Sequence, residues 1–182
     1  MGILIALSGP HGAGKSTYAR ALASAFHLRS VSAGDLFRQR AAELGLSLLE
    51  MTEKAEEDDR IDRSIDELMV QEADKDNVIL DGQLSAWLVK DRLNLSIYLT
   101  APDKVRFQRI ATRDTLTQEE AETTTRKREQ AERERFLKLY GIDITDLSIY
   151  HLVVDTNLKP LDEMITILKN IVRDYIEEKP KR

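Results

Sequence analysis

The segment that decides the fold is Gly9-Pro10-His11-Gly12-Ala13-Gly14-Lys15-Ser16. It follows the apolar run Ile3–Leu7 and leads into a helical pattern over Ser16–Phe26. Its glycines allow backbone angles that point successive N–H groups inward, which forms a nest for an anion. The N-terminus of the following helix adds a partial positive charge at the same place. A strand, this Gly-x-x-x-x-Gly-Lys-Ser spacing and a helix, in that order, predict a phosphate-binding loop.

Two side chains of this loop carry the predicted chemistry. Lys15 can reach the β- and γ-phosphates of a nucleoside triphosphate, and the Ser16 hydroxyl can bind Mg²⁺. His11 fills a free position of the loop, and we interpret it as a spacer and not as a base. A chance match to a glycine-rich turn is the alternative interpretation. The predicted contacts to ATP with Mg²⁺ come from Gly9, Pro10, His11, Gly12, Ala13, Gly14, Lys15, Ser16 and Thr17.

Outward from the loop, short apolar runs alternate with helical patterns. Several of the runs lack polar alternation, as expected of strands that are buried on both faces. The alternation predicts right-handed βαβ units and a parallel sheet, with ligands beyond the carboxyl ends of its strands. The runs are Ile3–Leu7, Arg29–Ser32, Asn77–Leu80, Leu95–Leu99 and Leu152–Val154, and the main helical patterns are Ser16–Phe26, Asp35–Leu44, Pro102 to about Arg113, Thr117 to about Leu139 and Pro160 to about Ile176.

The composition of the whole chain limits the possible functions. The 182 residues suit one domain, and no apolar run approaches the roughly 20 residues that cross a membrane. The net charge of -5 argues against a dedicated nucleic-acid binder, and the absence of cysteine excludes disulfides and thiolate metal sites. We expect a single domain over 1–182 in a cytoplasmic, monomeric protein without a membrane or stable nucleic-acid partner. Lys179–Arg182 is predicted to be a basic tail.

A phosphate loop alone does not separate kinases from other nucleotide-binding proteins. A GTPase would need a base-reading Asn-Lys-x-Asp motif, which the sequence lacks. A large ATPase module would normally need a longer chain. The length is suited to a small-molecule kinase, which also needs a grip on the acceptor phosphate, an acid near the metal and mobile arginines.

The segment after the second apolar run predicts the grip on the acceptor phosphate. Arg38 lies one turn into the helix that follows Ser32-Ala33-Gly34-Asp35, on the same side as Asp35. Its guanidinium is suited to bidentate phosphate binding. The alternative is that Asp35 caps the helix while Arg38 pairs with solvent or Glu43.

An acid at the end of the third apolar run is a candidate metal residue. Asp81 precedes Gly82, beside the predicted phosphate loop. It can hold Mg²⁺ through water or orient the acceptor. The alternative is a turn aspartate before glycine, which is a common pair.

Two rows of arginines predict a lid. Arg106, Arg109 and Arg113 share one helix face, and so do Arg128, Glu132 and Arg135 on the long charged helix. Closure of two antiparallel helices would bring these cations onto the transferring phosphoryl group and exclude water. Direct ligand contact is favoured for Arg109, Arg113, Arg128 and Arg135 but not for Arg106. The alternative is a solvated pair of helices with surface ion pairs.

The sequence resembles the archaeal-type cytidylate kinases, within the nucleoside monophosphate kinase superfamily. The resemblance runs from about Ile3 to about Ile171. It implies an α/β, three-layer P-loop NTPase fold with five parallel strands, a helical nucleotide-binding insertion (about 35–74, centred on 47–73) and a short lid (about 109–128). The segments that carry it are Ser8–Ser16, Ser32–Arg38, Glu56–Asp58, Ile61-Asp62, Asp81-Gly82, Leu84–Trp87, Tyr140–Asp143 and Ser148–Tyr150.

The resemblance also implies the substrates, ATP with CMP or dCMP, and several residue roles. Arg38 would hold the CMP phosphate, the Arg128 row would face the ribose and the phosphates, and Ser32 and Asp35 would lie at the pyrimidine. The predicted substrate-binding residues are Ser32, Asp35, Arg38, Asp81, Gly82, Gln83, Arg128, Glu132 and Arg135, the catalytic ones Lys15, Arg109, Arg113, Arg128 and Arg135, and the metal-binding ones Ser16 and Asp81.

The sequence departs from this family at Gln83, where members commonly have an arginine that would grip the acceptor phosphate. Glutamine donates hydrogen bonds without a charge. Losing one charge-assisted contact costs about 1.5–3 kcal/mol unless Arg38 or Arg128 replaces it.

The predicted mechanism is direct in-line transfer without a covalent enzyme intermediate. The acceptor oxygen is already anionic, so no strong base is required, which fits three histidines (His11, His27 and His151) that form no catalytic cluster. The alternatives are a kinase for AMP, UMP or another metabolite, and a nucleotide-gated or RNA-associated ATPase. The acidic charge and the 5% aromatic content count against an RNA surface.

Overall fold

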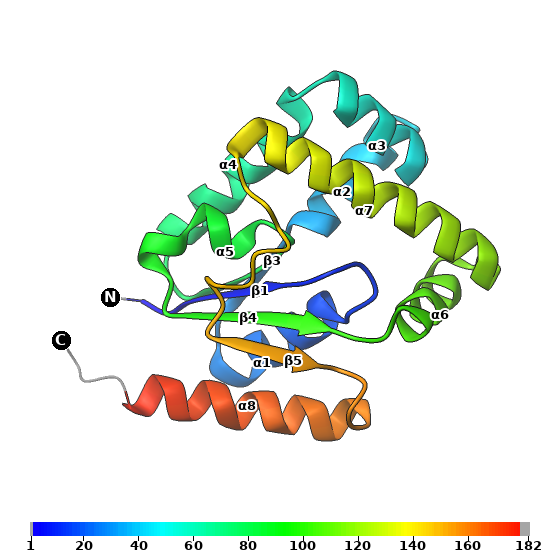
Figure 1. Ribbon diagram of the computed structural model, residues 1–182. Helices are drawn as coiled ribbons and strands as arrows, with labels where there is room; N and C mark the ends of the chain where they lie inside the picture. The colour runs from blue at the N-terminus through cyan, green and yellow to red at the C-terminus, as the bar shows by residue number, and fades with distance from the viewer. Residues whose placement is uncertain (1, 179–182) are drawn as a thin grey trace.

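Five parallel strands form one sheet in the computed structural model, which describes residues 2–178 (Figure 1). The order of the strands is β2-β3-β1-β4-β5, and every neighbouring pair is parallel. The predicted five-stranded parallel sheet is therefore confirmed. The strands are β1 (Leu4–Ser8), β2 (Arg29–Ser32), β3 (Val78–Asp81), β4 (Leu95–Thr100) and β5 (Leu152–Asp155).

Helices cover both faces of this sheet, as a three-layer α/β fold requires (Figure 1). One face packs against α1 and α8 through a core that includes Leu22 and Leu168. The other face packs against α4, with Met69 and Ala73 in the core. The helices are α1 (Lys15–Phe26), α2 (Ala33–Glu43), α3 (Leu48–Glu57), α4 (Arg60–Asp74), α5 (Ser85–Leu88), the 3₁₀ turn η1 (Lys90–Arg92), α6 (Asp103–Asp114), α7 (Gln118–Tyr140) and α8 (Leu161–Glu178).

The burial on both faces that was expected of several strands occurs in the inner strands and not in the two edge strands. The central strand β1 is buried throughout, whereas β2 and β5 have no buried residue, and Val153 is 53% exposed. The cause is their place in the sheet, because an edge strand has a neighbour on one side only. Burial on both faces belongs to the inner strands that carry the phosphate loop and Asp81.

The register of the strands brings the predicted site residues to one edge. Asp81 is paired with Leu7 on one side and with Ser32 on the other. The three strands β1, β3 and β2 therefore end side by side, and the chain leaves them into the loop at Gly9, the turn at Gly82 and helix α2. This edge is the site expected for ligands in a parallel sheet.

Helices α6 and α7 form an antiparallel pair that extends over this edge (Figure 1). Their contact buries Ile110, Ala111 and Ala121. Thr115 ends α6 in the left-handed region, and Thr117 with Glu120 starts α7 with a capping box. Helix α7 continues until it packs against α3. The predicted insertion (35–74) covers α2, α3 and α4, and the predicted lid (109–128) covers the α6–α7 junction; both roles stay predictions.

Across residues 2–178, no helix is both long and apolar enough to span a membrane. The predicted basic tail, Lys179–Arg182, lies outside the described residues.

Candidate active site

A cavity of about 710 Å³ lies beyond the carboxyl ends of β1, β2 and β3. This volume is in the range of sites for small ligands. Of the predicted loop residues, Gly9, Pro10 and Ala13 do not line it. The predicted residues that line it are His11, Gly12, Gly14, Lys15, Ser16, Thr17, Ser32, Asp35, Arg38, Asp81, Gly82, Gln83, Arg109, Arg113, Arg128, Glu132 and Arg135.

The phosphate loop requires glycine at the positions where it touches other elements. Gly9 has a φ of 139°, and a Cβ on it would lie 2.0 Å from the carbonyl oxygen of Leu99 in β4. Gly12 has a φ of 78°, and a Cβ there would lie 2.5 Å from the carbonyl oxygen of Arg106 in α6. A side chain at either position would push the loop away from these elements. The loop is therefore held in shape by β4 and α6.

The Lys15 ammonium is bound by its own loop. Its Nζ donates to the carbonyl oxygens of Gly9 at 2.8 Å and Pro10 at 3.0 Å. Burial lowers the pKa of Lys15, and the charge of Asp81 opposes this effect. A half-buried cation with only neutral oxygens as direct partners is suited to an anionic ligand.

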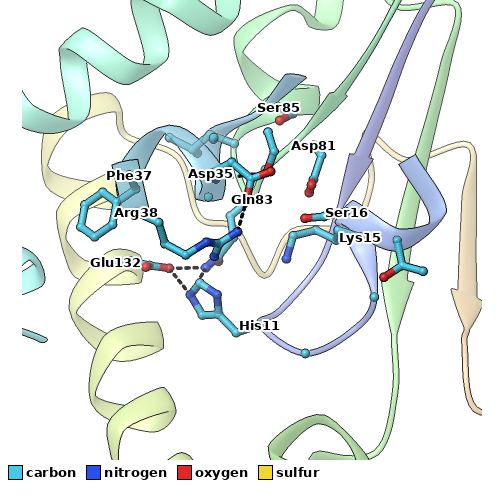
Figure 2. A pocket seen from close by; sticks show the side chains of 18 of the residues that line it. His11, Lys15, Ser16, Asp35, Phe37, Arg38, Asp81, Gln83, Ser85 and Glu132 are labelled. Atoms are coloured by element: carbon cyan, nitrogen blue, oxygen red, sulfur yellow. Dashed lines mark hydrogen bonds and ion pairs between the residues drawn. The ribbon is translucent and has the colours of Figure 1, made fainter. Parts of the chain in front are cut away.

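Asp81 offers a carboxylate oxygen for a cation. The residue is 1% exposed, and its Oδ2 is buried without a hydrogen-bond partner within residues 2–178. Ser16 lies on the facing loop, and both side chains point into the same space (Figure 2). Across the described part of the chain no group of three His, Cys, Asp or Glu is suited to bind a metal. One carboxylate and one hydroxyl fit Mg²⁺, which keeps several waters and shares its remaining ligands with substrate phosphates.

Arg38 lies across the cavity from Lys15, next to the ring of Phe37 (Figure 2). Its guanidinium donates to Asp35, and Ser32 caps α2 by accepting a hydrogen bond from the Asp35 N–H at 3.3 Å. Capping by Asp35 does not occur, because Asp35 lies in the first turn of α2 and Ser32 holds the N-cap position. Asp35 is thereby left to orient Arg38.

Glu132 connects α7 to the phosphate loop and to β3. Its Oε2 lies 2.8 Å from His11 Nε2 and accepts from the Gln83 amide, while Arg128 Nη2 donates to Oε1 at 3.5 Å (Figure 2). Burial alone would raise the pKa of Glu132, but its interaction with His11, together with the charges of Arg128 and Arg135, brings it down to about 2. Burial lowers the pKa of His11, and the charge of Glu132 opposes this effect. His11 thus anchors the loop and is more than a spacer.

Arg106 has a structural environment outside the cavity. Its guanidinium donates to the His11 carbonyl oxygen at 2.7 Å, to Glu129 at 2.7 Å and to Asp103 at 2.6 Å. Glu129 in turn accepts from the His11 N–H at 3.0 Å. This network fixes the outer side of the phosphate loop to α6 and α7, and it directs the Arg106 donors at the protein itself.

The other two arginines of the α6 row line the cavity, but each already has a partner. Arg109 Nη1 donates to Thr156 Oγ1 at 2.9 Å and to the Gly12 carbonyl oxygen at 3.3 Å. Arg113 binds Asp114 through two hydrogen bonds of 2.7 Å. Their predicted contact with a phosphoryl group stays a prediction, and it requires a local rearrangement of these side chains.

Sequence reasoning missed the far end of the cavity, where α4 faces α7. Arg135 Nε donates to Asp62 Oδ2 at 2.7 Å, and Tyr140 donates its hydroxyl hydrogen to Asp66 Oδ2 at 2.7 Å. Asp62 and Asp66 also line the cavity. One signal was available, because Asp62 occupies a position of the buried stripe of α4 that continues through Ile65. An acid on the apolar face of a helix needs a buried partner.

Together, the fold and this cavity place the chain among the P-loop kinases, since a phosphate loop and arginines on the helices α2, α6 and α7 surround one space. The comparison with known families is more specific. The model of the cytidylate kinase-like family matches residues 4–158, and the chain belongs to this family.

Curated relatives are similar to the chain over nearly their whole length. The cytidylate kinase of Staphylothermus marinus is 42% identical over 176 residues, which are 97% of this chain and 99% of that protein. The cytidylate kinase of Haloquadratum walsbyi is 43% identical over 174 residues, 95% of this chain and 91% of that protein.

Solved structures are similar in fold at low identity. An uncharacterized protein from Eubacterium ventriosum has a TM-score of 0.68 at 14% identity and covers 97% of this chain and 99% of its own. The shikimate kinase of Acinetobacter baumannii, in complex with shikimate, has a TM-score of 0.61 at 21% identity, covering 94% of each chain. These likenesses support the P-loop kinase fold alone.

Proposed function

We propose that the protein is a cytidylate kinase that transfers the γ-phosphoryl group of ATP to CMP or dCMP, giving ADP and CDP or dCDP. Relatives of this name, similar over almost the whole chain, support the proposal. The observation that carries it in the structure is one continuous cavity lined both by Lys15 of the phosphate loop and by Arg38 of α2. Such a cavity can hold the γ-phosphate of ATP next to the phosphate of CMP. A cytoplasmic location and a monomeric state stay predictions.

The donor end of the cavity is built for the triphosphate. The loop N–H groups and the N-terminus of α1 favour the β- and γ-phosphates, and Lys15 adds a full charge. Ser16 and Asp81 would hold Mg²⁺. When bound, this ion neutralises charge on the phosphate oxygens.

The acceptor end is built around Arg38 and Arg128. Arg38 pairs with the exposed carboxylate of Asp35, and the buried Nε of Arg128 has no partner within residues 2–178. Both can therefore donate to the phosphate of CMP. Gln83 already donates to Glu132, so its amide positions Glu132 and does not replace the arginine that is common there in the family.

In the transfer step, an oxygen of the CMP phosphate attacks the γ-phosphorus while the bond to the β–γ bridging oxygen breaks. The bonding electron pair leaves with ADP. The attacking oxygen is anionic, so no base has to remove a proton. His11 fits this mechanism, because its Nε2 is directed at Glu132. Lys15 neutralises the transferred group, and Arg109 and Arg113 would do so after closure of the lid.

A panel of acceptors tests the proposal. ADP release from Mg-ATP is measured with CMP, dCMP, UMP, AMP and shikimate. We expect CMP or dCMP to exceed the other acceptors in kcat/KM by at least about 10-fold. A higher value for UMP, AMP or shikimate would assign another acceptor. ATP hydrolysis that no acceptor changes would indicate an ATPase.

A further inference from the structure

The far end of the cavity is lined by apolar side chains and two carboxylates. Helices α2, α4 and α7 form its walls, and the acids Asp62 and Asp66 lie one turn apart on α4. A largely apolar lining is suited to a flat ring, and the acids supply hydrogen bonds at its edge. The apolar side chains that line this end include Phe37, Ile65, Met69 and Phe136.

Asp62 holds the guanidinium of Arg135, and both residues line the cavity. Its carboxylate accepts from Arg135 Nε at 2.7 Å and from Nη2 at 3.5 Å. The side chain of Arg135 is 7% exposed, and its Nη1 is buried without a partner within the described chain. A buried, unpaired guanidinium N–H is costly unless a ligand accepts from it. Arg135 therefore offers one donor at this end of the cavity.

Within the described residues, only one of the two carboxylate oxygens of Asp66 has a hydrogen-bond partner. Its Oδ2 accepts the Tyr140 hydroxyl at 2.7 Å, and no residue of the described range 2–178 donates to Oδ1. Tyr140 comes from the end of α7, so the packing of α7 on α4 fixes which oxygen is engaged. The other oxygen is left as an acceptor next to the Arg135 donor.

We propose that Asp66 selects the base of the acceptor nucleotide by accepting a hydrogen bond from its exocyclic amine, with Arg135 Nη1 donating to a neighbouring ring acceptor. This inference rests on the proposed function and assigns its base specificity. Cytosine carries an amine donor at N4 beside the acceptors N3 and O2, which matches an acceptor–donor pair. Uracil has a carbonyl oxygen in place of the amine, which would face an anionic carboxylate, and buried repulsion of this kind excludes a wrong ligand.

Tyr140 is a positioning residue in this arrangement. Because its O–H donates to Oδ2, it leaves Oδ1 for the base, and it opposes protonation of Asp66. Burial still raises the pKa of Asp66 to about 7, with Asp62 as a further contribution from the same helix. The guanidinium carbon of Arg63 lies 5.8 Å from the centroid of the Tyr140 ring. From α2 and α5, the side chains of Phe37 and Leu88 line this end of the cavity, and both are apolar.

Asp66→Asn tests the proposal through the ratio of kcat/KM for CMP to that for UMP. In this variant the amide oxygen would accept from Tyr140, and the amide NH₂ would face the base, where it suits uracil O4 and opposes the cytosine amine. We expect the ratio to fall by on the order of 100-fold. The matched control is Glu67→Gln, an exposed acid on the same helix, which should leave the ratio unchanged. Thermal melting of both variants shows whether the fold is kept.

The same ratio should depend on pH in the wild-type protein. Below about pH 7 the Asp66 carboxyl is mostly protonated and its O–H can donate to uracil O4, whereas above it only the carboxylate remains. The CMP-to-UMP ratio should therefore rise about 10-fold from pH 6 to pH 8.5. Taking a ratio at each pH cancels the other titrations that affect both substrates equally. In Asp66→Asn the pH dependence should disappear.

Tyr140→Phe separates positioning from a purely structural role. Loss of the hydroxyl donor should move the midpoint of the ratio's pH profile upward, which a packing defect alone would not do. This variant also tests the proposal if Asp66→Asn fails to fold. A wild-type enzyme that prefers CMP, with a ratio unchanged in both variants, would overturn the role of Asp66 and leave the proposed function intact. A wild-type enzyme that does not use CMP would overturn both.

Discussion

Lys15→Ala is expected to lower kcat/KM for CMP and ATP by about 10³-fold, because it removes the charge that neutralises the transferred phosphoryl group. The measurement is steady-state ADP release over a range of CMP and ATP concentrations. Lys54→Ala, which removes an exposed lysine of α3, is the matched control and should retain wild-type kinetics. Full transferase activity of Lys15→Ala would contradict the mechanism.

The same variant should not be less stable than the wild type. Burial holds the pKa of Lys15 below its usual value, so the folded protein binds this proton less tightly than the unfolded chain does. The lysine charge therefore opposes folding at neutral pH, and the two hydrogen bonds to Gly9 and Pro10 only offset part of this cost. An unchanged or higher melting temperature for Lys15→Ala would separate the catalytic loss from unfolding.

Asp62→Ala is expected to destabilise the protein by about 3–5 kcal/mol, since it leaves the Arg135 guanidinium buried without a counter-charge. The free energy of unfolding is measured by urea denaturation, with Glu67→Ala on the exposed face of α4 as the control. The ion pair joins segments 73 residues apart in sequence, so its loss should loosen α7 from α4.

A double variant distinguishes a lost ion pair from a lost cavity wall. Asp62→Leu with Arg135→Met replaces both charges by apolar side chains, and it should be more stable than either single variant. If the double variant is as unstable as the sum of the single ones, then the two side chains act independently and the ion-pair explanation fails.

The sequence was sufficient for the parts of the site that local geometry determines. The phosphate loop, Asp81 at its strand end and Arg38 one turn into its helix all follow from a few neighbouring residues, and the cavity contains side chains from each of them. The strand order and the edge positions of β2 and β5 are not local properties, which is why the sequence did not indicate which strands are buried on both faces.

The contacts of α7 are not local properties either, so they could not be predicted from the sequence. A helical spacing indicates that Arg128, Glu132 and Arg135 share a face, but not which partner each one meets. The fold pairs Glu132 with His11, and Arg135 with Asp62. These pairings depend on how α7 lies across α4 and the phosphate loop. They also give the Gln83 amide an acidic partner, Glu132.

Helix α7 is one continuous helix of 23 residues, about 35 Å long, and it contacts the phosphate loop through Glu129 and the proposed base pocket through Arg135. Because α7 is one uninterrupted helix, a tilt at one of its ends also moves the other end. The nucleotide that binds first would restrain α7, so the second nucleotide would bind to a helix that is already ordered. We therefore expect the two substrates to bind with positive and reciprocal cooperativity, each lowering the dissociation constant of the other by the same factor.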